Sequence, residues 1–374
     1  MIALLVIPLL LGLLLVDFGG GDDDEQETDD VPEEASDDAE DLTTSPTTNV
    51  ISGTSGDDII DAQGGNDTVY ALGGNDIVLG ENGDDHLFGG AGDDGLFGET
   101  GDDVLNGEDG NDLLDGGEGS DTLLGERGVD YIFGRSEADL LEGGDGGDVL
   151  DGGDHDDTLL GGEGIDVLLG GAGDDSANGG AGDDILTGGE GADSLHGGDG
   201  VDALFGGSSD LLGLGFGTAN VTGEVVNAIR ITNETNPSII LNGTAEEILA
   251  QPAFDSVDPA ILSEVVVDQH ADTLDGGQGD DLLFLEAGDS GTGGGGADLF
   301  LLDASQDGDF AIIEDYEPGS DQITVVYDGS GPAPLVTVHA GAFRTEILLD
   351  GEIAAIARNT TGQIEASDIN IVGV

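Results

Sequence analysis

The chain has 374 residues, and its charge is the first property that limits what it can do. It holds 83 Asp and Glu residues against five Lys and Arg, which gives a formal net charge of −78 at pH 7. Phosphate binding needs clustered basic side chains, so the composition excludes a nucleic-acid partner. The chain has no cysteine, which excludes disulfides, thiolate metal sites and cysteine nucleophiles.

The composition also implies that something must neutralise the charge if the chain folds. High net charge with few aromatic residues is typical of disordered chains, because such chains repel themselves and bury little apolar surface. Carboxylate and carbonyl oxygens are abundant here, and they are the ligands that hard divalent cations prefer. The composition therefore predicts binding of divalent cations.

The N-terminal part contains an apolar run over residues 2–16 and then an acidic low-complexity stretch. The run is shorter than the ~20 residues that a membrane-spanning helix needs. No basic residue precedes it and no small-residue cleavage site follows it, so it departs from the signal-peptide pattern as well. We interpret residues 1–18 as an anchor or targeting segment, with membrane contact through residues 2–16, and residues 19–52 as an acidic disordered linker.

From Gly53 the sequence becomes periodic. Residues 53–205 divide into 17 units of nine residues without insertion or deletion. Position six is Asp in every unit, and position eight is Ile, Val or Leu in all units but the one with Ala177. Position one is Gly except at Ala62 and Ala71, and position four is Gly except at Glu137 and His155.

This pattern predicts an all-β parallel β-roll solenoid. Glycines let the first six residues form a tight turn, and the last three form a short strand whose position eight faces inward. Successive units then lie on alternating sides, so that one coil takes 18 residues and a thin aliphatic core forms between two parallel sheets.

The unit GGxGxDxUx resembles the repeat of the RTX, or hemolysin-type calcium-binding, family. The resemblance covers residues 53–205 and returns over residues 267–301, in VDQHADTLD, GGQGDDLLF and GGGGADLFL. It implies multiple Ca²⁺ ions, bound in the turns by the position-six carboxylates and by carbonyl oxygens of adjacent coils. The weakest matches are GRSEADLLE (134–142) and GGDHDDTLL (152–160), which lack the position-four glycine. The metal ligands implied by the resemblance are Asp58, Asp67, Asp76, Asp85, Asp94, Asp103, Asp112, Asp121, Asp130, Asp139, Asp148, Asp157, Asp166, Asp175, Asp184, Asp193, Asp202, Asp272, Asp281 and Asp298.

Two segments lack the period. Residues 206–266 are predicted to be a non-repeat insertion with a small hairpin formed by AIRIT (228–232) and SIILN (238–242). Residues 302–374 are predicted to form a C-terminal β cap, in which IEDYEPGSDQI (313–323) resembles the capping segment of the family. The resemblance also implies type I secretion through an uncleaved C-terminal signal.

Catalytic motifs are weak throughout. GDSGT (288–292) is similar to a serine-protease nucleophile stretch, but it lies within the repeats and no matching His and Asp accompany it. Residues 303–314 fit a 12-residue EF-hand loop, yet their flanks predict strands, which favours coincidence. The sequence therefore predicts no catalytic and no cofactor-binding residues, and we interpret the protein as a non-enzyme.

Two functions are compatible with these patterns. The first is a secreted or surface-exposed calcium-binding RTX protein with a structural or adhesive role, which folds on calcium binding and has cell-surface or matrix components as partners. It would be extracellular or at the cell surface. The alternative is an RTX-associated secreted enzyme of the hydrolase or epimerase type. The non-repeat segments 206–266 and 302–374 are short for a catalytic domain, which favours the first function.

Overall fold

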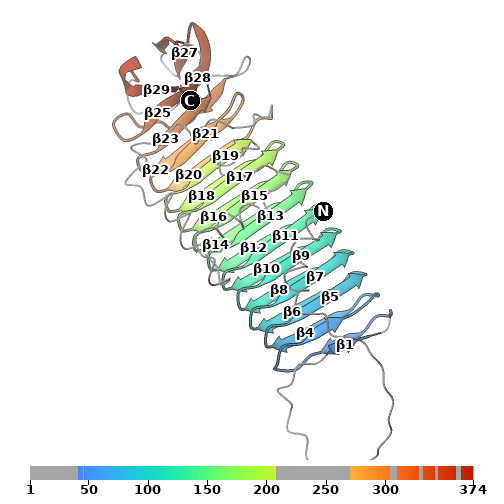
Figure 1. The fold of residues 1–374 in the computed structure, drawn as a ribbon. Coiled ribbons are helices and arrows are strands. Elements are labelled where there is room, and N and C mark those ends of the chain that lie inside the picture. Colours follow the sequence, from blue (N-terminus) through green and yellow to red (C-terminus); the bar gives the residue numbers. More distant parts are fainter. Residues whose placement is uncertain are drawn as a thin grey trace, which may run out of the picture.

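The computed structural model describes residues 41–44, 46–207, 270–303, 310–327, 332–341, 344–358 and 364–373. These residues form a long stack of strands in which successive strands alternate between two sheets (Figure 1). Among the described residues, no helix is both long and apolar enough to cross a bilayer. The predictions for residues 1–40, for the hairpin at 228–242 and for the tip of the EF-hand-like loop lie outside the described residues. The end of the predicted disordered linker 19–52 was wrong, because Asp41–Thr43 and Val50–Ser52 form strands that pair with the first repeats.

Sheet A has 14 strands, all parallel. In spatial order they are β1 (Asp41–Thr43), β3 (Ile59–Asp61), β5 (Ile77–Asn82), β7 (Gly95–Thr100), β9 (Leu113–Glu118), β11 (Tyr131–Ser136), β13 (Val149–Asp154), β15 (Val167–Ala172), β17 (Ile185–Glu190), β19 (Ala203–Gly207), β21 (Leu282–Leu285), β23 (Leu299–Asp303), β25 (Gln322–Tyr327) and β29 (Ile369–Gly373).

Sheet B has 15 strands, and only its last three pair antiparallel. A short 3-10 helix, η4 (Ala366–Asp368), precedes β29 of sheet A. The strands of sheet B are β2 (Val50–Ser52), β4 (Thr68–Gly73), β6 (His86–Ala91), β8 (Val104–Asp109), β10 (Thr122–Arg127), β12 (Leu140–Asp145), β14 (Thr158–Glu163), β16 (Ser176–Ala181), β18 (Ser194–Asp199), β20 (Thr273–Gln278), β22 (Ser290–Gly295), β24 (Ala311–Ile313), β28 (Glu352–Arg358), β27 (Arg344–Leu349) and β26 (Val336–Ala340).

The register follows the period of the sequence. Leu123 of β10 lies opposite Leu141 of β12, and Ile132 of β11 lies opposite Leu150 of β13, each one coil of 18 residues further on. Because every nine-residue unit crosses to the other sheet, two units complete one coil. The predicted parallel β-roll is thereby confirmed.

The strands are longer than predicted. Most of them include positions seven to nine of one unit and also positions one to three of the next, as in β8 (Val104–Asp109). The apolar signal ends at position eight and glycines follow it, a pattern that is typical of turns. The alternation of the strand nevertheless continues, so position one faces inward like position eight, and both are buried in β8.

The core is a double column of position-eight side chains, one column from each sheet. Leu96, Leu105, Leu114 and Leu123 are fully buried in it. Ala177 occupies the same column with a smaller side chain and is also buried. Each sheet therefore contributes a single layer of side chains to the core. Because this core is thin, we expect the turn residues at the two edges of the roll to provide further stabilisation.

The stack continues across the segment between β19 and β20. The N–H of Asp193 donates to Asp272 Oδ1 at 2.8 Å, although 79 residues separate the two in sequence. The ladder therefore continues from β18 to β20 without a break. The predicted boundary of the insertion at residue 206 is too early, because Gly206 and Gly207 still belong to β19.

The sequence IEDYEPGSDQI joins the repeats to the last strands. Ile313, Tyr316 and Ile323 are buried in the core, and the Tyr316 hydroxyl donates to the carbonyl oxygen of Asp321 at 3.0 Å. Asp315 accepts hydrogen bonds from the N–H groups of Gly293 and Gly294, both at 2.9 Å. The motif thus covers the aliphatic core with a tyrosine and satisfies backbone donors of the last repeat.

Candidate metal sites

The position-six aspartates form two continuous columns, one along each edge of the roll. In each column, the backbone N–H of one aspartate donates to Oδ1 of the aspartate in the next coil. Asp85 donates to Asp103 at 2.7 Å, and Asp103 donates to Asp121 at 2.8 Å. All the aspartates predicted from the repeats lie in these columns, which we call the inner ladder, and all are buried.

In 16 of these aspartates the second carboxylate oxygen is buried without a hydrogen bond. A buried acceptor without a partner costs about 1–3 kcal/mol, and more when it is charged, so a row of them calls for a ligand. The unpartnered Oδ2 atoms belong to Asp67, Asp76, Asp85, Asp94, Asp103, Asp112, Asp121, Asp130, Asp139, Asp148, Asp157, Asp166, Asp175, Asp184, Asp202 and Asp281.

A glycine at position one keeps the space beside these oxygens free of side chains, except in the units of Asp67 and Asp76, where Ala62 and Ala71 occupy this position. A Cβ on Gly98 would lie 2.4 Å from Asp103 Oδ2 and 2.6 Å from the carbonyl oxygen of Gly116, one coil further on. A Cβ on Gly125 would meet Asp130 Oδ2 and the Gly143 carbonyl oxygen at the same two distances. A carboxylate oxygen and a backbone carbonyl oxygen therefore converge in a cradle that any side chain would fill.

The cradle offers the donors that calcium takes. Ca²⁺ is bound by six to eight carboxylate and carbonyl oxygens, in flexible geometry. Among the described residues, no group of three His, Cys, Asp or Glu side chains gathers as a metal cluster. In the cradle, each coil contributes one carboxylate and the backbone contributes carbonyl oxygens, and these donors fit calcium.

Burial raises the pKa of many aspartates of the inner ladder toward neutral pH, as for Asp103 and Asp166. It raises the pKa of Asp103 to about 7, the N–H of Asp85 lowers this pKa, and the carboxylates of Asp121 and Asp85 raise it further. The pKa of Asp166 is raised to about 8, again mainly by burial. Without a cation, these carboxylates therefore hold protons at pH values where an ordinary Asp is ionised.

A second ladder, formed by position five, was not predicted from the sequence. Asp102 Oδ1 accepts from the N–H of Ser120 at 3.0 Å, and Asp93 Oδ1 accepts from the N–H of Asn111 at 2.9 Å. These side chains are exposed, and each accepts a hydrogen bond from an N–H group of the following coil. The aspartates of the inner ladder accept instead from an N–H group of the preceding coil. We call the position-five side chains the outer ladder. The signal for it was the frequent Asp or Asn before the position-six Asp.

Sequence reasoning also missed two members of the inner ladder. Asp289 Oδ1 accepts from the N–H of Asp272 at 3.1 Å, and Asp321 Oδ1 accepts from the N–H of Asp298 at 3.2 Å. Asp289 lies in an eight-residue unit, 285–292, so counting by nine misses it. Asp289 also belongs to GDSGT, whose serine, Ser290, begins β22 and is an ordinary strand residue of the roll.

The two units without the position-four glycine keep a positive φ at this position, although its value is smaller than at glycines such as Gly119, with φ 135°. Glu137 has φ 68° and His155 has φ 84°, in the left-handed region that favours glycine. Glu137 Oε2 accepts from the N–H of Gly119 at 3.0 Å, and the N–H of Glu137 donates to His155 Nδ1 at 3.2 Å. Each replacement thus pairs a side chain with the turn of the preceding coil.

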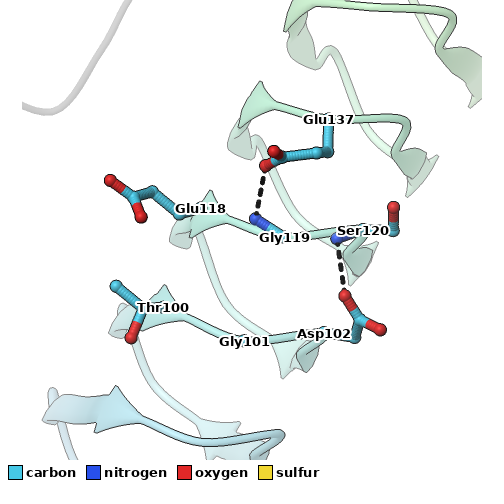
Figure 2. Close-up of a pocket in the computed structure, with 7 residues that line it drawn as sticks. All are labelled: Thr100, Gly101, Asp102, Glu118, Gly119, Ser120 and Glu137. Atoms are coloured by element: carbon cyan, nitrogen blue, oxygen red, sulfur yellow. Dashed lines mark hydrogen bonds between the residues drawn. The ribbon is translucent and has the colours of Figure 1, made fainter.

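Figure 2 shows the first of these contacts. Glu137 reaches back to Gly119, while Ser120 donates to Asp102 in the coil before. These residues line a wide, shallow depression together with Thr100 and Glu118. The depression is open to solvent and its charged side chains are acidic, so its chemistry is suited to cations, like that of the turns around it.

The comparison with protein-family models agrees with this geometry. The model of the RTX calcium-binding nonapeptide repeat matches residues 43–78, 70–105, 97–132, 133–168, 151–186, 160–195, 178–210 and 268–290, which together make up just over half of the chain. No curated protein matches the chain. From the repeat model and the two aspartate columns we conclude that the chain belongs to the RTX family and is a calcium-binding β-roll protein.

Proposed function

We propose that the chain is a secreted or surface-exposed structural protein whose roll folds when Ca²⁺ binds in its turns. The observation that carries the proposal is the inner ladder, with its buried, unpartnered Oδ2 atoms beside a glycine cradle. The residues that hold the ions in this proposal are the position-six aspartates and the carbonyl oxygens at position one.

Charge explains why folding would depend on the ion. Neighbouring carboxylates in a column repel one another, and the whole chain carries a net charge of −78. Bound calcium supplies the positive charge that lets the carboxylates remain ionised in the buried columns. Because an unfolded chain offers no preformed cradle, the binding free energy of the ions becomes folding free energy.

The expected affinity links folding to location. Extracellular calcium modules bind with dissociation constants of about 10⁻⁴ to 10⁻³ M. Resting cytosol holds too little calcium for such sites, so the chain would stay unfolded inside the cell and fold outside. A stiff acidic rod that forms there suits a structural or adhesive role, with cell-surface or matrix components as its partners.

Circular dichroism across a calcium titration tests the coupling. The full chain in excess chelator should lack the strand signal, which should then appear cooperatively as calcium is added. Magnesium at equal concentration is the control, because Mg²⁺ dehydrates reluctantly and demands octahedral geometry. An identical, fully folded spectrum in chelator would show that the ion is dispensable for folding.

Cell fractionation tests the location separately. The chain with and without residues 1–18 should be compared in cells and in medium. Export in both cases supports a C-terminal signal, whereas membrane association that is lost with residues 1–18 supports an N-terminal anchor. Purely cytosolic protein in both cases would refute a secreted or surface-exposed function, and it would leave the calcium result untouched.

A further inference from the structure

The outer faces of the two sheets have different chemistry. Positions seven and nine point away from the core on every repeat strand. On sheet B these positions carry polar residues in the C-terminal half of the repeats, such as Ser176 and Asn178 of β16. On sheet A they are mostly apolar, as in Val167 and Leu169 of β15 and Phe205 of β19. The polar exceptions from β13 to β23 are Asp151 and Thr187. We call positions seven and nine of β13 to β23 the apolar face.

The apolar face is buried although it points away from the core. Val167, Leu169, Ile185, Phe205 and Phe284 are between 3% and 6% exposed. Ser176 and Asn178, at the equivalent positions of sheet B, are exposed. A two-sheet roll cannot cover its own outer faces, and the described strands of this region lie only in the two sheets. Something beyond these strands therefore shields the face.

The shielding is local, because the same face continues toward the N-terminal end without it. Ile77 and Leu79 of β5, Phe97 of β7 and Leu113 of β9 are apolar and point the same way, but they are only half-buried. Both halves of this outer face carry apolar side chains, so residue type does not explain why only one half is shielded. The position along the roll must explain it. The shielded half contains β19, the last strand before residues 208–269.

A polar group within the face gives an independent sign that water is excluded. The hydroxyl of Thr187, at position nine of β17, is buried and has no hydrogen-bond partner. On an exposed sheet surface, water would reach this group. At the border of the face, Arg135 forms two bonds to Asp115, at 2.9 and 2.6 Å, and lies 4.8 Å from the ring centroid of Phe133.

We propose that residues 208–269 of this chain dock on the apolar face of sheet A. The segment is 62 residues long, and both of its ends are attached to the roll, after β19 and before β20. Such tethering gives an effective concentration in the millimolar range at the face, which a second copy could not match in dilute solution. The shielded positions extend from β13 to β23, on both sides of these attachment points, within reach of a tethered occupant.

The composition of the segment fits an apolar partner surface. It contains nine acidic residues in 62, a lower density than the 83 in 374 of the whole chain. It also carries the apolar stretches AIRIT (228–232) and SIILN (238–242), which an acidic linker would lack. Covering the face with this segment would remove an apolar patch that otherwise promotes association.

Photo-cross-linking of the full, calcium-loaded chain tests the docking. A photoreactive residue at Leu169 should form cross-links to peptides of residues 208–269. The matched control is the same residue at Asn178, which is also at position nine but on sheet B, and it should give no such cross-links. An equal mixture of ¹⁴N and ¹⁵N chains shows whether a cross-link joins one molecule or two.

Each outcome decides the question. Intramolecular cross-links from position 169 to residues 208–269 support the proposal. Cross-links between labelled and unlabelled chains would assign the face to a second copy instead, and equal capture from positions 169 and 178, or no capture at all, would also overturn the proposal. Because calcium-induced strand signal is recorded on the same samples, a failure of the proposed calcium-dependent folding is distinguished from a failure of docking.

Hydrogen exchange on the unaltered chain provides a second measurement. Residues 208–269 should exchange at least ~10-fold more slowly than an unfolded chain of the same sequence, because docking protects backbone amides. The double variant Val167→Asp with Phe205→Asp should abolish this protection, whereas Ser176→Asp with Ser194→Asp on sheet B should leave it unchanged. Exchange at the unfolded rate in the unaltered chain would overturn the proposal without any variant.

Discussion

The inner and outer ladders lie one residue apart in the same turns, yet they differ in almost every physical respect. Asp102 and Asp103 carry the same side chain, and each accepts a backbone N–H through Oδ1, at 3.0 and 2.7 Å. Asp103 is 1% exposed, has an unpartnered Oδ2 and lies beside the Gly98 cradle, whereas Asp102 lies in solvent. Environment, and not residue type, thus separates a candidate metal ligand from a surface cap.

The largest expected effect concerns the inner-ladder aspartates whose pKa is raised, and their response to pH without calcium. Burial raises the pKa from 3.8 to about 7 for Asp103 and to about 8 for Asp166. The folded state therefore binds more protons than the unfolded state, and its stability falls as pH rises from about 4 to about 8. In chelator, the chain should show more strand signal at pH 5 than at pH 8.

The control for this effect is the same pH series in saturating calcium. Each unit of pKa shift corresponds to about 1.4 kcal/mol, so many shifted groups together should give a large change in chelator. In calcium, the strand signal should stay constant between pH 6 and 8, because the ions displace the protons. A chelated chain that is equally unfolded at pH 5 and pH 8 would contradict the raised pKa values.

The next largest effect is expected from filling one cradle. The Cβ of Gly98→Ala would lie 2.4 Å from Asp103 Oδ2, so the carboxylate must move. We expect a loss of about 1–3 kcal/mol of stability and a smaller number of calcium ions bound, measured by urea unfolding and by titration calorimetry. In the matched control, Gly73→Ala, the Cβ meets only the Ala91 carbonyl oxygen, at 3.6 Å. Equal losses of stability and of bound calcium in the two variants would show that the space beside Asp103 Oδ2 is not needed for calcium binding.

Replacing one aspartate of each ladder in the same turn compares the two ladders directly. Asp103→Ala leaves the N–H of Asp85 without its buried acceptor and removes one carboxylate from the cradle. It should cost about 1.5–3 kcal/mol in calcium, the usual range for a hydrogen bond to a charged group. Asp102→Ala should cost about 0.5 kcal/mol, because water can replace an exposed acceptor. A larger loss of stability for Asp102→Ala than for Asp103→Ala in urea unfolding would show that burial does not determine which ladder contributes more to stability.

The smallest expected difference lies within the inner ladder. Asp139 and Asp175 accept backbone hydrogen bonds of almost equal length, 2.7 and 2.8 Å. The turn of Asp139 contains Glu137 at φ 68°, whereas the turn of Asp175 has Gly173 at position four. We expect Asp175→Ala to lose more calcium-induced stability than Asp139→Ala, by less than about 1 kcal/mol. Thermal melting with and without calcium measures both variants, and a larger loss for Asp139→Ala would contradict the ranking.

Most of the roll could be predicted from the sequence because its interactions repeat with its period. Leu105 and Leu123, one coil apart, occupy equivalent environments, so one strand assignment and one inward direction serve all the repeats. The same holds for the position-six aspartates, which the nine-residue count places in columns. Asp289 lies in a unit of eight residues, so counting by nine did not predict it as a member of the inner ladder. Only the hydrogen bond from Asp272 in the structure identifies it as one.

The sequence by itself determined the roll, its core column and the inner ladder, because these depend on residues whose neighbours are fixed by a constant period. Only the tertiary structure decided which oxygens remain without a partner, that position five bonds forward while position six bonds backward, and that Val167 and Phe205 are shielded while Phe97 is not. The physical reason is that burial and hydrogen bonding depend on what lies in the next coil or beyond the sheet, and a pattern within one unit carries no information about either.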